Sequence, residues 1–209
     1  ISDSLFPIGA FTLSNGLETM VLQEKLTTKE DLDRYVKNYM KLLPFNNLGI
    51  MMLAWQRADD PDFLRQLDEV SMAVKTPREV REGTVKLCRR FLKLWKQLRE
   101  YKSLAWYQEE VKEGRCIGDH SIAVGLYARE IGLEQELAGA VYVYNLITSI
   151  VTNAVKTVPL SQIAGQQILN QALEQVEECV AKAKEVEKED LGVGGTQMDI
   201  AAMNHETLY

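Results

Sequence analysis

The sequence predicts an all-α fold, a single-domain bundle of about eight to ten helices around a central apolar helix. Three observations support this prediction. Apolar residues recur at the three-to-four-residue spacing of helices, alternating strand patterns are nearly absent, and the five prolines all lie at expected helix boundaries, where a missing N–H costs least. With 209 residues, 46% of them hydrophobic, the chain is long enough to bury one substantial core.

The expected helices cover residues 17–24, 28–43, 47–58, 61–74, 77–98, 103–112, 119–131, 134–156 and 160–189. Two of the starts carry the pattern of an N-terminal capping box, in which a Ser or Thr is followed three residues later by an acidic residue. Thr28 precedes Asp31, and Thr76 precedes Glu79 with Pro77 between them at the expected first helical position. No repeat of about 30 to 45 residues is evident, so a compact bundle is favoured over a solenoid.

The central helix is expected at residues 134–156. Between Glu136 and Lys156 lie nineteen uncharged residues, "LAGAVYVYNLITSIVTNAV", which reach the length that crosses a bilayer. However, Asn, Thr and Ser residues occur through its second half, and no other such stretch accompanies it. A core helix surrounded by other helices must be apolar nearly all round, so a buried helix is favoured over a membrane span.

Charge argues against nucleic-acid binding. The formal charge is −6 and the pI is about 5.1, whereas a nucleic-acid binder needs a concentrated basic face. One modest basic cluster lies on a single side of the helix after Thr76, where a solvated face is favoured over an anion site. Its members are Lys86, Arg89, Arg90, Lys93 and Lys96.

The C-terminal part divides into an acidic helix and a tail. Residues 174–190 hold seven acidic residues and three lysines, so this part of the helix is expected to protrude into water. The stretch "LGVGG" at 191–195 then ends the helix, because glycine adopts the left-handed conformations found at helix ends. No Gly-Lys-Ser/Thr follows, so a phosphate-binding loop is disfavoured. We therefore predict a helical domain at 1–190 and a hinged tail of the same domain at 191–209.

Catalytic chemistry has few candidates in this sequence. The chain has two histidines, and "CIGDH" places Cys116, Asp119 and His120 close enough to be considered as metal ligands. Gly118 interrupts the helical spacing, and Asp119 is better explained as the N-cap of the next helix. His205 and Glu206 lack the second histidine of a zinc-peptidase helix. The sequence predicts no catalytic set and no cofactor; a metal-dependent enzyme or metal-binding protein using Cys116, Asp119 and His120 is the alternative.

The three cysteines are widely separated, which fits a reducing compartment better than a disulfide framework. The first residues lack the basic leader of a signal peptide. We therefore expect a cytoplasmic protein.

Three segments resemble the signature segments of the urease accessory protein F family, the UreF-type nickel-insertion chaperones. They are "SDSLFPIGAFTLSNGLE" at 2–18, "NAVKTVPLSQIAGQQIL" at 153–169 and "DIAAMNHETLY" at 199–209. Phe6 and Ala10 replace the leucine and glycine more usual in the family. Lys156 stands where arginine is common, which keeps the charge and loses the forked donor. The family normally continues with Ser-Arg-Leu after the position of Tyr209, so the resemblance predicts further residues there.

The resemblance implies an all-helical, usually dimeric, cytoplasmic protein that is not itself a hydrolase. It implies an adaptor between a scaffold accessory protein of the UreD/UreH type, which docks on apo-urease, and a nickel-carrying GTPase of the UreG type. In this role the protein helps to time GTP hydrolysis with the delivery of nickel.

The tail is the expected partner-binding segment, hinged by its glycines, mobile in the free protein and ordered by the scaffold protein. The alternative is that the tail packs on the chain's own core. The predicted partner-binding residues are Met198, Ile200, Met203, His205, Glu206, Leu208 and Tyr209, together with Lys156.

Overall fold

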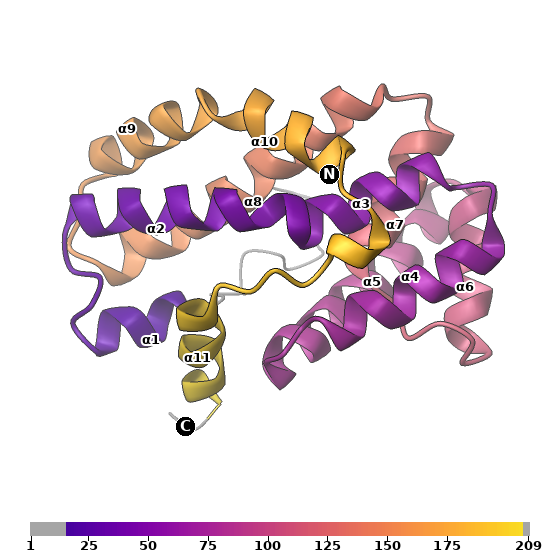
Figure 1. Ribbon diagram of the computed structural model, residues 1–209, viewed down its shortest axis with the longest axis horizontal. Helices are drawn as coiled ribbons and strands as arrows, with labels where there is room; N and C mark the ends of the chain where they lie inside the picture. Colours follow the sequence, from indigo (N-terminus) through magenta and orange to yellow (C-terminus); the bar gives the residue numbers. More distant parts are fainter. Residues whose placement is uncertain (1–15, 207–209) are drawn as a thin grey trace.

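The structure is a computed structural model that describes residues 16–206; residues 1–15 and 207–209 lie outside the described residues. Figure 1 shows the arrangement of its helices. The helices are α1 (Leu17–Leu22), α2 (Lys29–Leu42), α3 (Asn47–Gln56), α4 (Pro61–Ala73), α5 (Arg78–Leu98), α6 (Lys102–Lys112), α7 (His120–Glu130), α8 (Gln135–Thr157), α9 (Gln162–Leu173), α10 (Val176–Lys184) and α11 (Thr196–His205), with 3₁₀ turns η2 (Leu43–Phe45) and η3 (Lys188–Asp190). Residues 16–206 contain no strand, so the all-α prediction is confirmed.

The two predicted capping boxes have different outcomes. At α2 the box is present, because the Thr28 hydroxyl accepts from the Asp31 N–H while the Asp31 carboxylate accepts from the Thr28 N–H. At α5 it is absent, since Pro77 is itself the N-cap and the helix begins at Arg78. The Glu79 N–H of the first turn donates instead to Glu206 Oε1, at 3.1 Å. A carboxylate from the tail thus caps α5, which local sequence could not predict.

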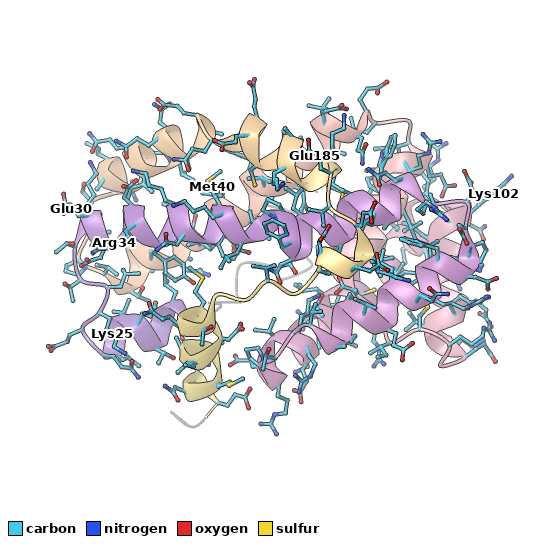
Figure 2. The ribbon with its side chains drawn as sticks, viewed as in Figure 1. Lys25, Glu30, Arg34, Met40, Lys102 and Glu185 are labelled. Carbon is cyan, nitrogen blue, oxygen red and sulfur yellow. The ribbon has the colours of Figure 1, made fainter. Side chains whose placement is uncertain are left out.

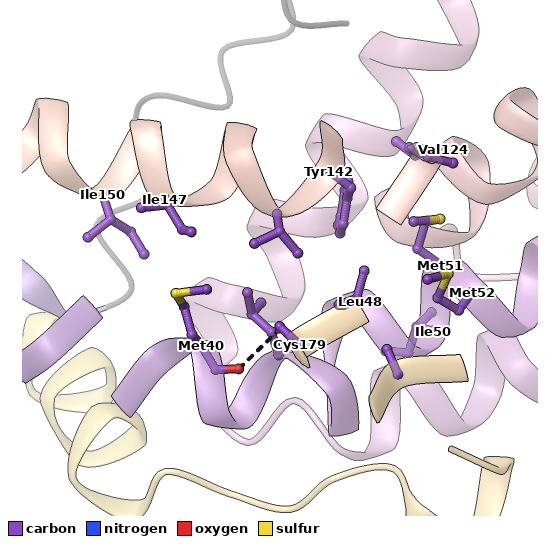
Figure 3. Close-up of a cluster of buried hydrophobic side chains, with 14 of the residues drawn as sticks. Met40, Leu48, Ile50, Met51, Met52, Val124, Tyr142, Ile147, Ile150 and Cys179 are labelled. Atoms are coloured by element: carbon purple, nitrogen blue, oxygen red, sulfur yellow. Dashed lines mark hydrogen bonds between the residues drawn. The ribbon is translucent and has the colours of Figure 1, made fainter. Parts of the chain in front are cut away.

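Helix α3 lies at the middle of the molecule (Figure 1), and its residues 48–54 are all buried. It packs closely on α7 because Gly125 has no side chain: a Cβ there would lie 2.3 Å from the Met51 carbonyl oxygen. Figure 3 shows Leu48, Ile50 and Met52 of α3 within the buried cluster. Leu48 and Ile50 are fully buried, so α3 is enclosed on all sides.

Helix α8 contributes one face to the same core. Val143 and Ile147 are buried, whereas Leu137 and Tyr144 on the other side are 53% and 43% exposed. By length and composition α8 could cross a membrane, but half of its most apolar window is buried inside the molecule. Its Ile147 and Ile150 point toward Met40 of α2 (Figure 3), as in the core helix of a helical bundle.

The predicted helix at 160–189 is wrong in two respects. It is divided into α9, α10 and η3, and α10 does not protrude. Val176, Val180 and Ala183 recur at helical spacing and are buried, so α10 packs on the core with its acidic residues outward. The Cys179 thiol, also buried, donates to the Met40 carbonyl at 3.4 Å (Figure 3). The acidic composition of residues 174–190 suggested an exposed helix, although the apolar residues of α10 recur on one face.

Charged side chains lie at the outer surface. Figure 2 shows Glu30 of α2 and Lys102 of α6 at opposite edges of the molecule, and Glu185 after α10 is also exposed. The basic cluster on α5 has the same character, because Lys86, Arg89, Arg90, Lys93 and Lys96 are all exposed. This arrangement is that of a solvated helix face.

Candidate partner-binding site

The linker before α11 is fixed to the core by backbone hydrogen bonds. The Gly192 N–H donates to the Phe45 carbonyl at 2.9 Å, and the Asn46 side-chain amide donates to the Val193 carbonyl at 2.9 Å. Gly192 has φ of +93°, and a Cβ there would lie 2.7 Å from the Val74 side chain. The predicted left-handed glycine is therefore present, at a point where the chain turns tightly against α4.

The tail forms helix α11, which lies beside α1 and contacts α5 (Figure 1). Its inner face is made by Ala201 and Ala202, which are buried. This face rests on Gly16, where a Cβ would lie 2.7 Å from the Ala202 nitrogen and 2.9 Å from the Ala201 Cβ. Small residues on both sides let the two backbones approach closely.

His205 and Glu206 join the end of α11 to both neighbouring helices. The His205 Nδ1 lies 2.7 Å from Glu79 Oε2 of α5, and its Nε2 lies 3.0 Å from Glu18 Oε2 of α1. Glu206 accepts from the Glu79 N–H and pairs with Arg78 at 3.5 Å. Burial alone lowers the pKa of His205, but the hydrogen bonds to Glu79 and Glu18 outweigh it and raise that pKa above its usual value.

The outer face of α11 is open to solvent and partly apolar. Ile200 is 51% exposed and Met203 is 37% exposed, whereas Met198 is half-buried against the core. A groove of about 620 Å³ lies beside the first turn of α11, lined by α1, α2 and Met198. These features place an accessible apolar helix face next to a hollow.

The structure brings most of the predicted site residues together on α11. The mobility of the free tail stays a prediction, but residues 196–205 form a helix packed on the chain's own core, as in the alternative. The reason is that Ala201, Ala202 and the His205 contacts supply burial and hydrogen bonds within the chain. Tyr209 and Leu208 lie outside the described residues.

Lys156 does not join this group. It is exposed in the last turn of α8, and among the residues that the structure describes no hydrogen bond or ion pair connects it with α11. Sequence reasoning also missed Gly16, Glu18 and Glu79 as the contacts of α11. Gly16 and Glu18 belong to the signature segment at 2–18, and this segment could have indicated a functional contact. No sequence pattern indicated Glu79 as a contact of α11.

The residues of the alternative metal site have other roles. Asp119 is the predicted N-cap of α7, accepting from the Ser121 N–H at 2.6 Å. Burial lowers the pKa of His120 to about 4 and raises the pKa of the Cys116 thiol to about 12, so the thiol is protonated at neutral pH. Within residues 16–206 no group of three or more His, Cys, Asp or Glu side chains could hold a metal ion. The geometry therefore gives the alternative no support.

Asp119 belongs instead to a buried network that joins α4, α6 and α7. Its carboxylate lies 2.6 Å from the Lys75 ammonium, and its N–H donates to the Tyr107 hydroxyl at 2.7 Å. The Tyr107 hydroxyl in turn donates to Asp68, which also accepts from the Gly118 N–H at 3.0 Å. Burial raises the Asp119 pKa, but Lys75 outweighs it and holds that pKa below its usual value. The network fixes the loop before α7.

Together these features describe an all-helical domain whose helix α11 packs on the core and offers an exposed apolar face. A family model described as UreF matches residues 26–173. The urease accessory protein UreF of Actinobacillus pleuropneumoniae serotype 5b (strain L20) is 35% identical, over 99% of this chain and 92% of that protein. Those of Haemophilus influenzae (strain PittGG) and Bacillus sp. (strain TB-90) are 34% and 31% identical, over 99% and 100% of this chain and 89% and 93% of their own lengths.

The chain therefore belongs to the UreF family of urease accessory proteins. The family predicted from the three signature segments is confirmed. The matched relatives are named as accessory proteins and not as the urease enzyme.

Proposed function

We propose that this protein is the adaptor of urease nickel-centre assembly. It bridges a scaffold accessory protein of the UreD/UreH type, bound to apo-urease, and a nickel-carrying GTPase of the UreG type, and it modulates GTP-dependent nickel delivery. Nickel is the cargo of this process and not a resident cofactor of the chain. Family membership supports the general role, and the resemblance described above supplies the partners.

The observation that carries the proposal is the outer face of α11. Ile200 and Met203 are exposed although both are apolar, while Ala201 and Ala202 between them are buried. A helix that leaves two apolar side chains in water offers anchors of the kind that a partner's hydrophobic groove binds. We assign the scaffold protein to this face, in a cytoplasmic complex that contains two copies of the chain. Lys156 remains a predicted partner contact on a separate part of the surface.

The test is scaffold binding by variants of the exposed face. Ile200→Asp and Met203→Glu place charges where apolar contact is expected, so each should weaken binding to the cognate scaffold protein more than about 10-fold. Both side chains are exposed, so circular dichroism spectra and thermal unfolding should match those of the parent.

Leu98→Asp is the matched control, because Leu98 is 62% exposed at the far end of α5. It should bind the scaffold protein as the parent does. Parental affinity in both α11 variants would exclude this face as the binding site.

A further inference from the structure

The end of α11 is held by a histidine between two carboxylates from different helices. Glu79 of α5 lies at one ring nitrogen of His205, at 2.7 Å, and Glu18 of α1 lies at the other, at 3.0 Å. A neutral imidazole has one N–H and one lone pair, so it can donate to only one of these carboxylates. Its other nitrogen would then direct a lone pair at a carboxylate oxygen. Only the protonated ring, with two N–H groups, donates to both.

The charged side chains around His205 increase the effect that its proton has on the packing of α11. Glu18, Glu79 and Glu206 supply three carboxylates, and Arg78 is the one other cation paired with them in this part of the described structure. Without the proton on His205, three negative charges would face one positive charge. Repulsion between the carboxylates of α1, α5 and α11 would then oppose the packing of the tail helix.

The rest of the contact between α11 and the core is small. Its buried residues are Ala201 and Ala202, the two smallest apolar side chains of the helix, and Met198 is half-buried. Alanine side chains bury little apolar area, so their burial stabilises the contact weakly. The polar contacts of His205 and Glu206 therefore have a large share in fixing α11.

We propose that protonated His205 is a latch that holds α11 against α1 and α5, and that loss of this proton releases the helix for its partner. The release of a partner-binding segment rests on the function proposed above, whereas the latch itself does not. Glu18 and Glu79 are its two acceptors, and Gly16 provides the close approach of the backbones that puts the ring between them.

The direction of the pH dependence follows from the contacts. Hydrogen bonds to Glu79 and Glu18 raise the pKa of His205 in the packed state above its usual value near 6.5, against the lowering effect of burial. The latch is therefore complete below about pH 6.5 and is lost as the pH rises through the raised pKa. Release is therefore expected as the pH rises above 6.5 through that raised pKa.

The chain allows a direct test because it has two histidines. His120 is buried with a pKa lowered to about 4, so in a titration from pH 6 to 9 it stays neutral and His205 is the histidine whose charge can change. The experiment follows two NMR signals of the full chain between these values: the His205 Cε1–H resonance, and the methyl resonance of Met198, which reports packing of α11. Both should change with one common midpoint above 6.5.

The double variant Glu18→Gln, Glu79→Gln should lower that midpoint by about 1 pH unit, because it removes both acceptors' charges. Glu82→Gln is the matched control, because Glu82 lies on α5 and pairs with Arg78 at 3.9 Å and Lys86 at 3.8 Å, whereas the carboxylates paired with His205 are Glu18 and Glu79. It should leave the midpoint unchanged. A His205 midpoint at or below 6.5, or a Met198 methyl signal that does not follow it, would overturn the latch.

Scaffold binding at pH 6.5 and 8.5 separates the latch from the proposed function. The parent should bind more tightly at pH 8.5, and the double variant should lose most of this difference. Equal affinity of the parent at the two values would overturn the regulatory role. Absence of binding at both, with the NMR titration intact, would refute the proposed function and leave the latch standing.

Discussion

Gly16 lies directly against the backbone of the tail helix. It has φ of +83°, and its missing Cβ would lie 2.7 Å from the Ala202 nitrogen and 2.9 Å from the Met198 carbonyl oxygen. Backbone atoms cannot move aside as the end of a flexible side chain can. Any larger residue at 16 must therefore displace α11 or strain the start of α1.

Gly16→Ala should accordingly loosen α11. The left-handed conformation alone costs an alanine roughly 1–2 kcal/mol, and the overlap with α11 should add about 1–3 kcal/mol unless the helix moves away. Hydrogen exchange of the α11 amides is the measurement, and their protection should fall sharply.

Gly114→Ala is the control for backbone strain. Gly114 has φ of +73°, but nothing lies within 4 Å of the Cβ position. This variant should lose stability from the conformation alone and keep the protection of α11. Equal protection of α11 in both variants would mean that Gly16 does not position the tail.

At the scale of single elements, helix existence was predictable and the contacts between helices were not. The Thr28 box formed as predicted because its donors and acceptors are three residues apart. At α5 the acceptor is Glu206, 127 residues away from Glu79, and no local pattern signals it. The same holds for α10, where three buried apolar side chains outweigh an acidic composition.

The buried face of α8 gives the prediction at this scale. Val143 is fully buried and Tyr144, the next residue, is 43% exposed on the other side. Val143→Asp would place an unpaired charge in the core, at a cost of about 3–5 kcal/mol against a total stability on the order of 5–15 kcal/mol. Urea unfolding should show this loss, or the variant should fail to fold.

Tyr144→Asp tests the same helix on its exposed side and should stay folded with nearly parental stability. If Val143→Asp also unfolds at the parental urea concentration, the face of α8 assigned to the core is wrong.

For the molecule as a whole, the family could be recognised from three short segments, while the state of the tail could not be predicted from its composition. Few apolar residues follow the glycines, which suggested a segment that does not pack on the core of its own domain. In the structure the tail packs against Gly16, Glu18 and Glu79, which are all distant in sequence from α11. Cys116 and His120 show the reverse case, since residues near in sequence have separate roles in the core.

The core of the protein lies in α3, α7 and α8, and α11, the recognition element proposed above, lies at the edge. A helix that packs weakly on its own domain can exchange those contacts for those of a partner at small cost. For this reason we assign partner binding to α11 and the stability of the fold to the remaining helices.

The measurement that tests the adaptor role most directly is an omission experiment with purified proteins. The cognate scaffold protein and the GTPase, with GTP, are passed over a size-exclusion column with light-scattering detection, first alone, then with this protein, and then with its Met203→Glu variant. We expect the scaffold protein and the GTPase to elute together only when the parental protein is present. Co-elution of the two without it, or equally well with the Met203→Glu variant, would contradict a bridge that depends on α11.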